Sequence, residues 1–116
     1  MSEVTLYGIK NCDTVKKARK WLDQADVAYH FHDLRSDGLS ERQVQGWLAA
    51  VGTDTLINKR STTWKGLNDI EKAQALQADS ATAILLNNPT LIKRPVLECN
   101  GNVHIGFKAE HYHTLF

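Results

Sequence analysis

The sequence is poor in the features that define several classes of protein. Its 116 residues contain only two prolines and two cysteines, Cys12 and Cys99, and no Cys-x-x-Cys pair. Two distant cysteines cannot form a disulfide framework, and we expect both to be free thiols. The longest apolar run, residues 81–86, is interrupted by Thr82 and is far shorter than the roughly 18 residues of a membrane span. The N-terminus has no basic start or long apolar stretch, so we expect no signal peptide and a cytoplasmic location.

The chain also lacks an excess of charge of either sign. Fourteen Lys and Arg residues face thirteen Asp and Glu residues, which gives a formal net charge of +1. A nearly neutral chain has no general attraction for nucleic acid or for an anionic membrane. With 42% hydrophobic and 23% charged residues, the composition is typical of a compact soluble domain. We expect one domain over residues 1–116, a monomer, with no nucleic-acid or membrane partner.

The first 35 residues show a strand, a helix and a second strand. Residues 4–7 are β-branched and aromatic, and apolar positions at three- and four-residue intervals then predict a helix; these positions are Val15, Ala18, Leu22 and Ala25. A second strand is predicted over residues 28–34. Two strands joined by a single helix predict a parallel, right-handed βαβ unit.

The middle of the sequence is predicted to be mainly helical. Ser40 and Gln43 form a capping-box pattern, and the helix that follows is expected to end at Gly52. Residues 53–67 show no sustained period and are predicted to be a loop. Two short helices are expected, one at 69–77 and one from an N-cap at Ser80 to about residue 87, with Pro89 closing the segment.

The last quarter returns to strands. Residues 96–99 and 103–107 flank an Asn-Gly pair at 100–101, which is a strong hairpin signal. Residues 108–116 are expected to form a short helix with Ala109, Tyr112 and either Leu115 or Phe116 facing inward. The predicted order is βαβ, then helices, then ββα, which is an α/β fold.

Cys12 is the residue that the sequence favours as a reactive thiol. It lies between a predicted strand and the first turn of a helix, where backbone N–H groups and the helix dipole favour a thiolate. Lys10, Lys16 and Lys17 add positive potential, whereas Asp13 opposes it and could instead cap the helix. The alternative is that Cys12 is simply a small buried hydrophobic residue.

Two mechanisms are excluded by spacing around Cys12. A phosphatase of the Cys-x5-Arg type needs an arginine at position 18, which is Ala18, and the intervening residues lack the glycines of a phosphate loop. A Cys-x-x-Cys oxidoreductase needs a second cysteine at position 15, which is Val15. Disulfide chemistry at Cys12 therefore needs another thiol, for which glutathione is the natural external source.

Three segments carry a resemblance to a known family. They are YGIKNCDTVKKA at residues 7–18, NKR at 58–60 and LIKRPV at 91–96. Together they closely resemble the arsenate reductase-like (ArsC/Spx) family, most specifically its YffB branch, over nearly the whole chain. The resemblance implies a thioredoxin/glutaredoxin-like fold with a core at residues 1–36 and 89–116 and a helical insertion at 37–88.

The resemblance also implies roles for individual residues. Cys12 takes the place of the nucleophile, and Arg60 and Arg94 match the arginines that bind an oxyanion. A guanidinium can hold an oxyanion or carboxylate through two hydrogen bonds, although a surface arginine often only solvates a loop. Pro95 is expected to follow a cis peptide bond beside the active thiol. Lys10 and Asn11 are either supporting site residues or ordinary turn residues.

The sequence departs from the arsenate-reducing members near its C-terminus. Where those members carry an additional arginine, typically as Gly-Arg-Pro, this chain has Gly106-Phe107-Lys108. Lys108 could supply a positive charge but lacks the fork geometry of arginine. We therefore expect that arsenate is not the physiological substrate.

The remaining candidates favour structural roles. His30 and His32 would share a strand face, but no third ligand lies beside them, so no metal site is expected. His111 and His113 would diverge on the terminal helix. Cys99 is expected in the core, and Trp64 is expected to pack, with a possible role in anchoring the Arg60 loop.

The function that we expect is a thiol-dependent reductase. Cys12 would attack an oxidised anionic or disulfide substrate, Arg60 and Arg94 would line the anion pocket, and glutathione would be the co-substrate, with no tightly bound cofactor. One alternative is an Spx-like regulator that binds RNA polymerase, although such members usually carry the Cys-x-x-Cys switch that Val15 breaks. Another is a protein that binds glutathione without catalysis.

Overall fold

The computed structural model describes residues 4–116, which divide into two compact units. We call the described part of residues 1–37 together with residues 94–116 the sheet unit, and residues 38–93 the helical unit. The bounds of the helical unit are close to those of the predicted insertion, 37–88, but the unit extends to Lys93. Its last residues are held by backbone hydrogen bonds, from Asn58 N to Leu91 O at 2.8 Å and from Lys93 N to Leu56 O at 2.7 Å.

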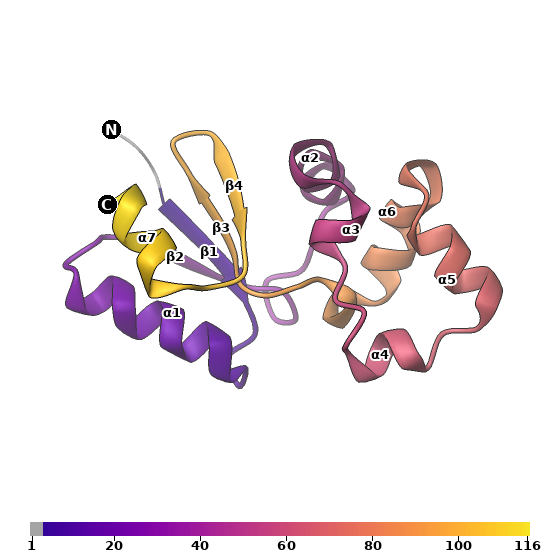
Figure 1. The fold of residues 1–116 in the computed structure, drawn as a ribbon, viewed down its shortest axis with the longest axis horizontal. Coiled ribbons are helices and arrows are strands. Elements are labelled where there is room, and N and C mark those ends of the chain that lie inside the picture. The colour runs from indigo at the N-terminus through magenta and orange to yellow at the C-terminus, as the bar shows by residue number, and fades with distance from the viewer. Residues whose placement is uncertain (1–3) are drawn as a thin grey trace. The chain divides into compact units, whose positions relative to one another are not determined.

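The sheet unit contains a four-stranded sheet with the order β2-β1-β3-β4 (Figure 1). The strands are β1 (Val4–Gly8), β2 (His30–Asp33), β3 (Val96–Cys99) and β4 (Asn102–Ile105). β1 is parallel to β2 and antiparallel to β3, and β3 is antiparallel to β4. The predicted α/β class, the βαβ start and the terminal hairpin are confirmed.

One face of this sheet carries the core of the sheet unit. The helices α1 (Asp13–Gln24) and α7 (Ala109–Leu115) contribute to it, and its buried members are Leu6, Ala18, Leu22, Leu97, Cys99 and Tyr112. The Trp21 ring on α1 meets the Tyr112 ring on α7 edge-on, with centroids 5.7 Å apart. Burying each leucine of this set stabilises the fold by about 1.5–3 kcal/mol.

The strand and helix ends refine the sequence predictions. Asn100 and Gly101 both have positive φ, 54° and 78°, as a two-residue type I′ hairpin requires. β4 ends at Ile105 instead of residue 107 because Gly106, at φ 81°, turns the chain and donates its N–H to Pro95 O at 2.9 Å. In α7, Tyr112 is buried as predicted, but Ala109 is exposed and the prediction for it was wrong.

The helical unit consists of short helices. They are α2 (Glu41–Val51), α3 (Thr53–Leu56), α4 (Thr62–Lys65), α5 (Asp69–Ala75), α6 (Ala78–Asn87) and a 3-10 turn, η1 (Pro89–Leu91). Its buried side chains include Val44, Trp47, Leu56, Ile57, Ala81, Leu85, Leu91 and Ile92. In the described residues no helix is long and apolar enough to cross a membrane.

Local capping explains where these helices begin. The Ser40 capping box is present in full, because the Ser40 side chain accepts from Gln43 N and the Gln43 side chain accepts from Ser40 N. The prediction of a loop at 53–67 was wrong in part, because this segment contains α3 and α4. Each of these helices has only four residues, which is too short to show a helical period in the sequence. The N-cap predicted at Ser80 was also wrong: α6 begins after Gln77, and the Ser80 hydroxyl donates to Gln74 O at 2.6 Å.

Candidate functional site

Cys12 lies at the N-cap position of α1, directly after the turn that follows β1. Its backbone is extended (φ −93°, ψ 125°), its N–H donates to Ile9 O at 3.2 Å and its carbonyl accepts from Lys16 N at 2.9 Å. Asp13 is the first residue of the helix and not its cap. The Cys12 side chain is partly exposed, so the thiol is not the buried hydrophobic residue of the alternative interpretation.

Cys99 provides the contrast within the same unit. It lies on β3 with 3% of its surface exposed, and burial raises the pKa of its thiol. A buried, neutral thiol is a poor nucleophile. The prediction that Cys99 is a core residue is confirmed.

The pairing of β1 with β3 brings Arg94 and Pro95 to the turn that precedes Cys12. Tyr7 pairs with Val96 in an antiparallel register, so the residues just before β3 lie at the edge where the chain leaves β1. The Arg94–Pro95 peptide bond is cis, as the resemblance implied. Cys12 and Arg94 thus belong to neighbouring segments of the sheet unit, although 82 residues separate them in the sequence.

The Arg94 guanidinium has unused donors. Its Nε and Nη1 atoms are buried and have no hydrogen-bond partner among the described residues. A buried guanidinium donor without a partner is costly, and an oxyanion or carboxylate would satisfy both atoms. The chemistry of this donor set therefore fits an anion.

The other predicted arginine, Arg60, belongs to the helical unit. It is exposed, and its N–H donates to Asn58 Oδ1 at 3.0 Å in the turn before α4. Trp64 is half-buried beside this turn, where its backbone N–H donates to Ser61 Oγ at 3.1 Å. Lys72 Nζ lies 5.8 Å from the Trp64 ring centroid, so Trp64 packs within the helical unit, as predicted.

Of the predicted supporting residues, Pro95 is buried, whereas the other three lie on the surface of the sheet unit. Lys10 and Asn11 are exposed in the turn before Cys12, and Lys108 is exposed at the N-cap of α7. Among the described residues, no three or more His, Cys, Asp or Glu side chains are grouped as metal ligands would be.

Sequence reasoning missed Asp33, a carboxylate that supports the turn before Cys12. It is 5% exposed at the end of β2, and its Oδ1 accepts from Arg35 N at 2.8 Å and Ser36 N at 3.1 Å. Burial raises the pKa of the Asp33 carboxyl, but backbone donors from Ser36, Arg35 and Lys10, with the Lys10 charge, hold the pKa below its ordinary value. The signal was available: an aspartate that ends a strand before a polar turn is typical of an Asx turn.

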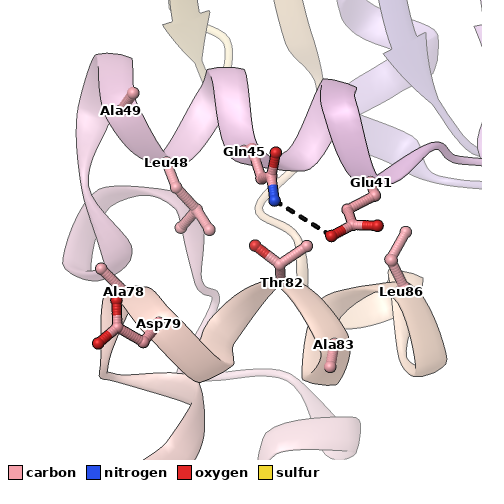
Figure 2. A pocket seen from close by; sticks show the side chains of 9 residues that line it. All are labelled: Glu41, Gln45, Leu48, Ala49, Ala78, Asp79, Thr82, Ala83 and Leu86. Carbon is pink, nitrogen blue, oxygen red and sulfur yellow. Dashed lines mark hydrogen bonds between the residues drawn. The ribbon is translucent and has the colours of Figure 1, made fainter.

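A separate groove lies in the helical unit between α2 and α6. Figure 2 shows its lining, which combines apolar side chains such as Leu48 and Leu86 with Glu41 and Asp79, and its volume is about 550 Å³. The Gln45 side chain donates to Glu41 Oε1 at 3.2 Å. Neither cysteine nor arginine lines the groove, so it lacks the groups of a thiol or anion site.

Comparisons with known proteins place the chain in a family. The model of the ArsC family matches residues 7–115. An uncharacterised protein from Haemophilus influenzae is 45% identical over 97% of this chain and 98% of its own length. The global transcriptional regulator Spx of Staphylococcus aureus is 30% identical, over 92% of this chain and 82% of its own.

Solved structures show the same fold. The YffB protein has a TM-score of 0.90 and 43% identity over 96% of both chains. An arsenate reductase from Vibrio cholerae has a TM-score of 0.82, with 20% identity over 98% of both chains, and shares the fold alone. The family match over nearly the full length, together with these relatives, shows that the chain belongs to the ArsC family.

Proposed function

We propose that this chain is a thiol-dependent reductase that uses Cys12 as its only nucleophile and glutathione as its reductant. The observation that carries the proposal is the neighbourhood of Cys12, a partly exposed thiol at a helix N-cap, beside the segment that holds unpartnered Arg94 donors. The proposed setting is the reducing cytoplasm, where glutathione is available and free thiols persist.

The proposed reaction has two thiol–disulfide exchange steps. The Cys12 thiolate attacks the glutathione sulfur of a mixed disulfide, which forms a Cys12–glutathione disulfide and releases the substrate thiolate, which takes up a proton. The thiolate of a second glutathione then attacks that disulfide, which forms oxidised glutathione and restores the Cys12 thiolate. In sum, the S–S bond of the mixed disulfide is broken and that of oxidised glutathione is formed, so the substrate sulfur is reduced to a thiol while the sulfur of the incoming glutathione is oxidised from a thiol to a disulfide.

In this mechanism the arginines bind negative charge. Arg94 would hold a carboxylate of the glutathionyl group or an oxyanion of the substrate through its Nε and Nη1 donors, and we propose that Arg60 contributes a second guanidinium. Lys10, Asn11 and Lys108 would have supporting roles. Arsenate is not the substrate that we propose, because Phe107 and Lys108 stand where the arsenate-reducing members carry Arg and Pro.

Substitution of the two cysteines tests the proposal. The assay follows oxidised glutathione formed from the mixed disulfide of glutathione and 2-mercaptoethanol. We expect Cys12→Ser to reduce turnover to the uncatalysed rate and Cys99→Ser, the matched control, to keep it. Mass spectrometry should find a glutathione adduct on Cys12 of the wild type. Glutathione binding without turnover in the wild type would support a non-catalytic binding protein instead.

Substitution of Arg94 tests the anion site. Because a hydrogen bond to a charged group contributes about 1.5–3 kcal/mol, we expect Arg94→Lys to lower kcat/KM by roughly tenfold to a hundredfold. Arg60→Lys tests the second guanidinium in the same assay. Full activity of both variants would contradict the arginine-lined pocket.

A transcriptional regulator that binds RNA polymerase is the second candidate, favoured by the 30% identity to Spx. Val15 stands where a second cysteine of a redox switch would lie, which favours the enzyme. Recovery of RNA polymerase subunits with the tagged chain, together with no glutathione-linked turnover, would reverse the order of the two proposals.

A further inference from the structure

The exposed side of α1 carries a row of lysines that begins at the Cys12 end of the helix. Lys16 and Lys20 follow Cys12 at intervals of four residues, which places the three on one side of the helix. Both lysines are exposed, whereas the opposite side of α1 buries Val15, Ala18 and Leu22. We call Lys16 and Lys20 the lysine row.

The fold itself does not use these two charges. Among the described residues the recorded ion pair is Lys59 with Asp54, in the helical unit, and neither Lys16 nor Lys20 has an acidic partner within 4.0 Å. Arg19 on the same helix differs, because its guanidinium lies 4.2 Å from the Phe31 ring centroid and its Nε donates to Tyr29 OH at 3.2 Å. Asp13 and Asp23 lie three positions from Lys16 and Lys20 on α1, but neither pair is within the 4.0 Å of an ion pair, so the charges of the lysine row remain available to a ligand.

The dimensions of the row indicate what it can bind. Eight residues of helix separate Cys12 from Lys20, which corresponds to about 12 Å along the axis. An extended polypeptide advances about 3.3 Å per residue, so roughly four residues beside a substrate cysteine would lie along the row. Acidic side chains in those four positions would face Lys16 and Lys20.

We propose that the lysine row selects protein substrates whose glutathionylated cysteine is flanked by an acidic segment. This inference rests on the proposed function and names its substrate class. Cys12 attacks the glutathione sulfur, the protein thiolate leaves and takes up a proton, and a second glutathione resolves the adduct on Cys12. The lysines take no part in bond exchange; they bring the acidic segment to α1 and raise the rate of encounter, an effect that salt screens.

Two matched peptides test the proposal. Each carries one glutathionylated cysteine, followed within four residues by three glutamates in one peptide and three glutamines in the other. For the wild type at low salt we expect kcat/KM to be about tenfold higher for the glutamate peptide, and the preference to shrink as salt is added. In the double variant Lys16→Gln, Lys20→Gln the ratio should fall to near one. This ratio cancels any effect of the substitutions on Cys12 itself.

A second double variant controls for charge. Arg42→Gln with Lys65→Gln removes two exposed positive charges from the helical unit and should leave the preference unchanged. Equal kcat/KM for the two peptides in the wild type, or an unchanged preference in the Lys16/Lys20 variant, would overturn the proposal.

Binding measured apart from turnover separates this inference from the proposed function. Fluorescence anisotropy with labelled, unmodified versions of the two peptides on Cys12→Ser reports the lysine row alone. If the glutamate peptide binds more tightly but the wild type shows no turnover, the reductase proposal is contradicted and the proposal that the lysine row binds an acidic segment is supported. Equal binding of both peptides would contradict the proposed role of the lysine row, whether or not the small mixed disulfide is turned over.

Discussion

The two units of this chain are built in different ways. In the sheet unit, β1 and β3 lie nearly 90 residues apart in the sequence and are joined residue by residue, with Leu6 opposite Leu97. In the helical unit the elements are short and consecutive, and several begin at a local cap such as Ser40 or Asn68. Both cysteines lie in the sheet unit and Arg60 lies in the helical unit.

Because of this difference, the sheet unit positions the turn before Cys12 through long-range pairing, whereas the helical unit is stabilised mainly by local contacts. The turn before Cys12 owes its surroundings to long-range register, since Gly8 pairs with Asp33 of β2 and Tyr7 pairs with Val96 of β3. The helical unit depends instead on caps and on the burial of a few large side chains. Substitutions in the two units should therefore show different physical signatures.

The largest expected effect is in the helical unit, at Trp47. Its side chain is 1% exposed on α2, and truncation of a buried aromatic residue costs about 3–5 kcal/mol. We expect Trp47→Ala to lower the free energy of unfolding by this amount in urea denaturation, and amide exchange to accelerate most within residues 38–93. Arg42→Ala, an exposed change on the same helix, is the control and should stay within about 0.5 kcal/mol. A loss below about 1 kcal/mol for Trp47→Ala would contradict the burial.

A smaller effect is expected in the sheet unit, at Gly8 of β1, which lies against Val15 of α1. A Cβ atom at Gly8 would lie 2.6 Å from Val15 Cγ2 and 2.9 Å from Val15 Cγ1. We expect Gly8→Ala to cost about 1–3 kcal/mol because of overpacking, measured by urea denaturation. In a Val15→Ala background the same substitution should cost much less. Equal costs in both backgrounds would show that Val15 is not the obstacle.

The smallest expected effect concerns the charge of Asp33. Because the pKa of Asp33 is lowered in the folded state, its carboxylate stabilises the fold above the unfolded pKa of about 3.9, and this stabilisation is lost as the pH falls through the lower folded value. Asp33→Asn keeps an acceptor oxygen but loses the charge, so we expect a loss of about 1 kcal/mol at pH 7.

The pH dependence of that difference is the check. Urea denaturation from pH 7 to pH 3 should show the wild type and Asp33→Asn converging below about pH 4. Asp37→Asn, an exposed carboxylate whose Oδ2 accepts from Asp33 N at 2.9 Å, is the matched variant. A difference that is constant with pH would contradict the role of the Asp33 charge.

The sequence predicted the framework better than the details. The βαβ start, the Asn-Gly hairpin and the Ser40 capping box were all readable because each depends on local periodicity or on turn chemistry. The helices α3 and α4 were not, since four residues contain barely one turn. The extension of the helical unit to Lys93 depends on pairing between Ile57 and Ile92, which no local pattern reveals.

The candidate site divides in the same way. Cys12 was found from its place between a strand and a helix, and Arg94 and Arg60 came only from family resemblance. The unpartnered donors of Arg94 depend on tertiary surroundings, so residue type alone could not show them. The hydrogen bonds of Asp33 to Arg35 N and Ser36 N are local instead, and the pattern of an Asx turn could have predicted them.

The place of β3 in the chain has a consequence for synthesis. A ribosome adds residues from the N-terminus, so β1 emerges with its parallel neighbour β2 but must wait for β3 until residues 96–99 are made. At about 5–20 residues per second the delay is roughly 5–20 s. Throughout that interval the edge of β1 that will pair with β3 is open, and the whole helical unit, residues 38–93, is synthesised before β3 appears. An unpaired strand edge can pair with another chain, so the nascent chain is exposed to aggregation until β3 has been made.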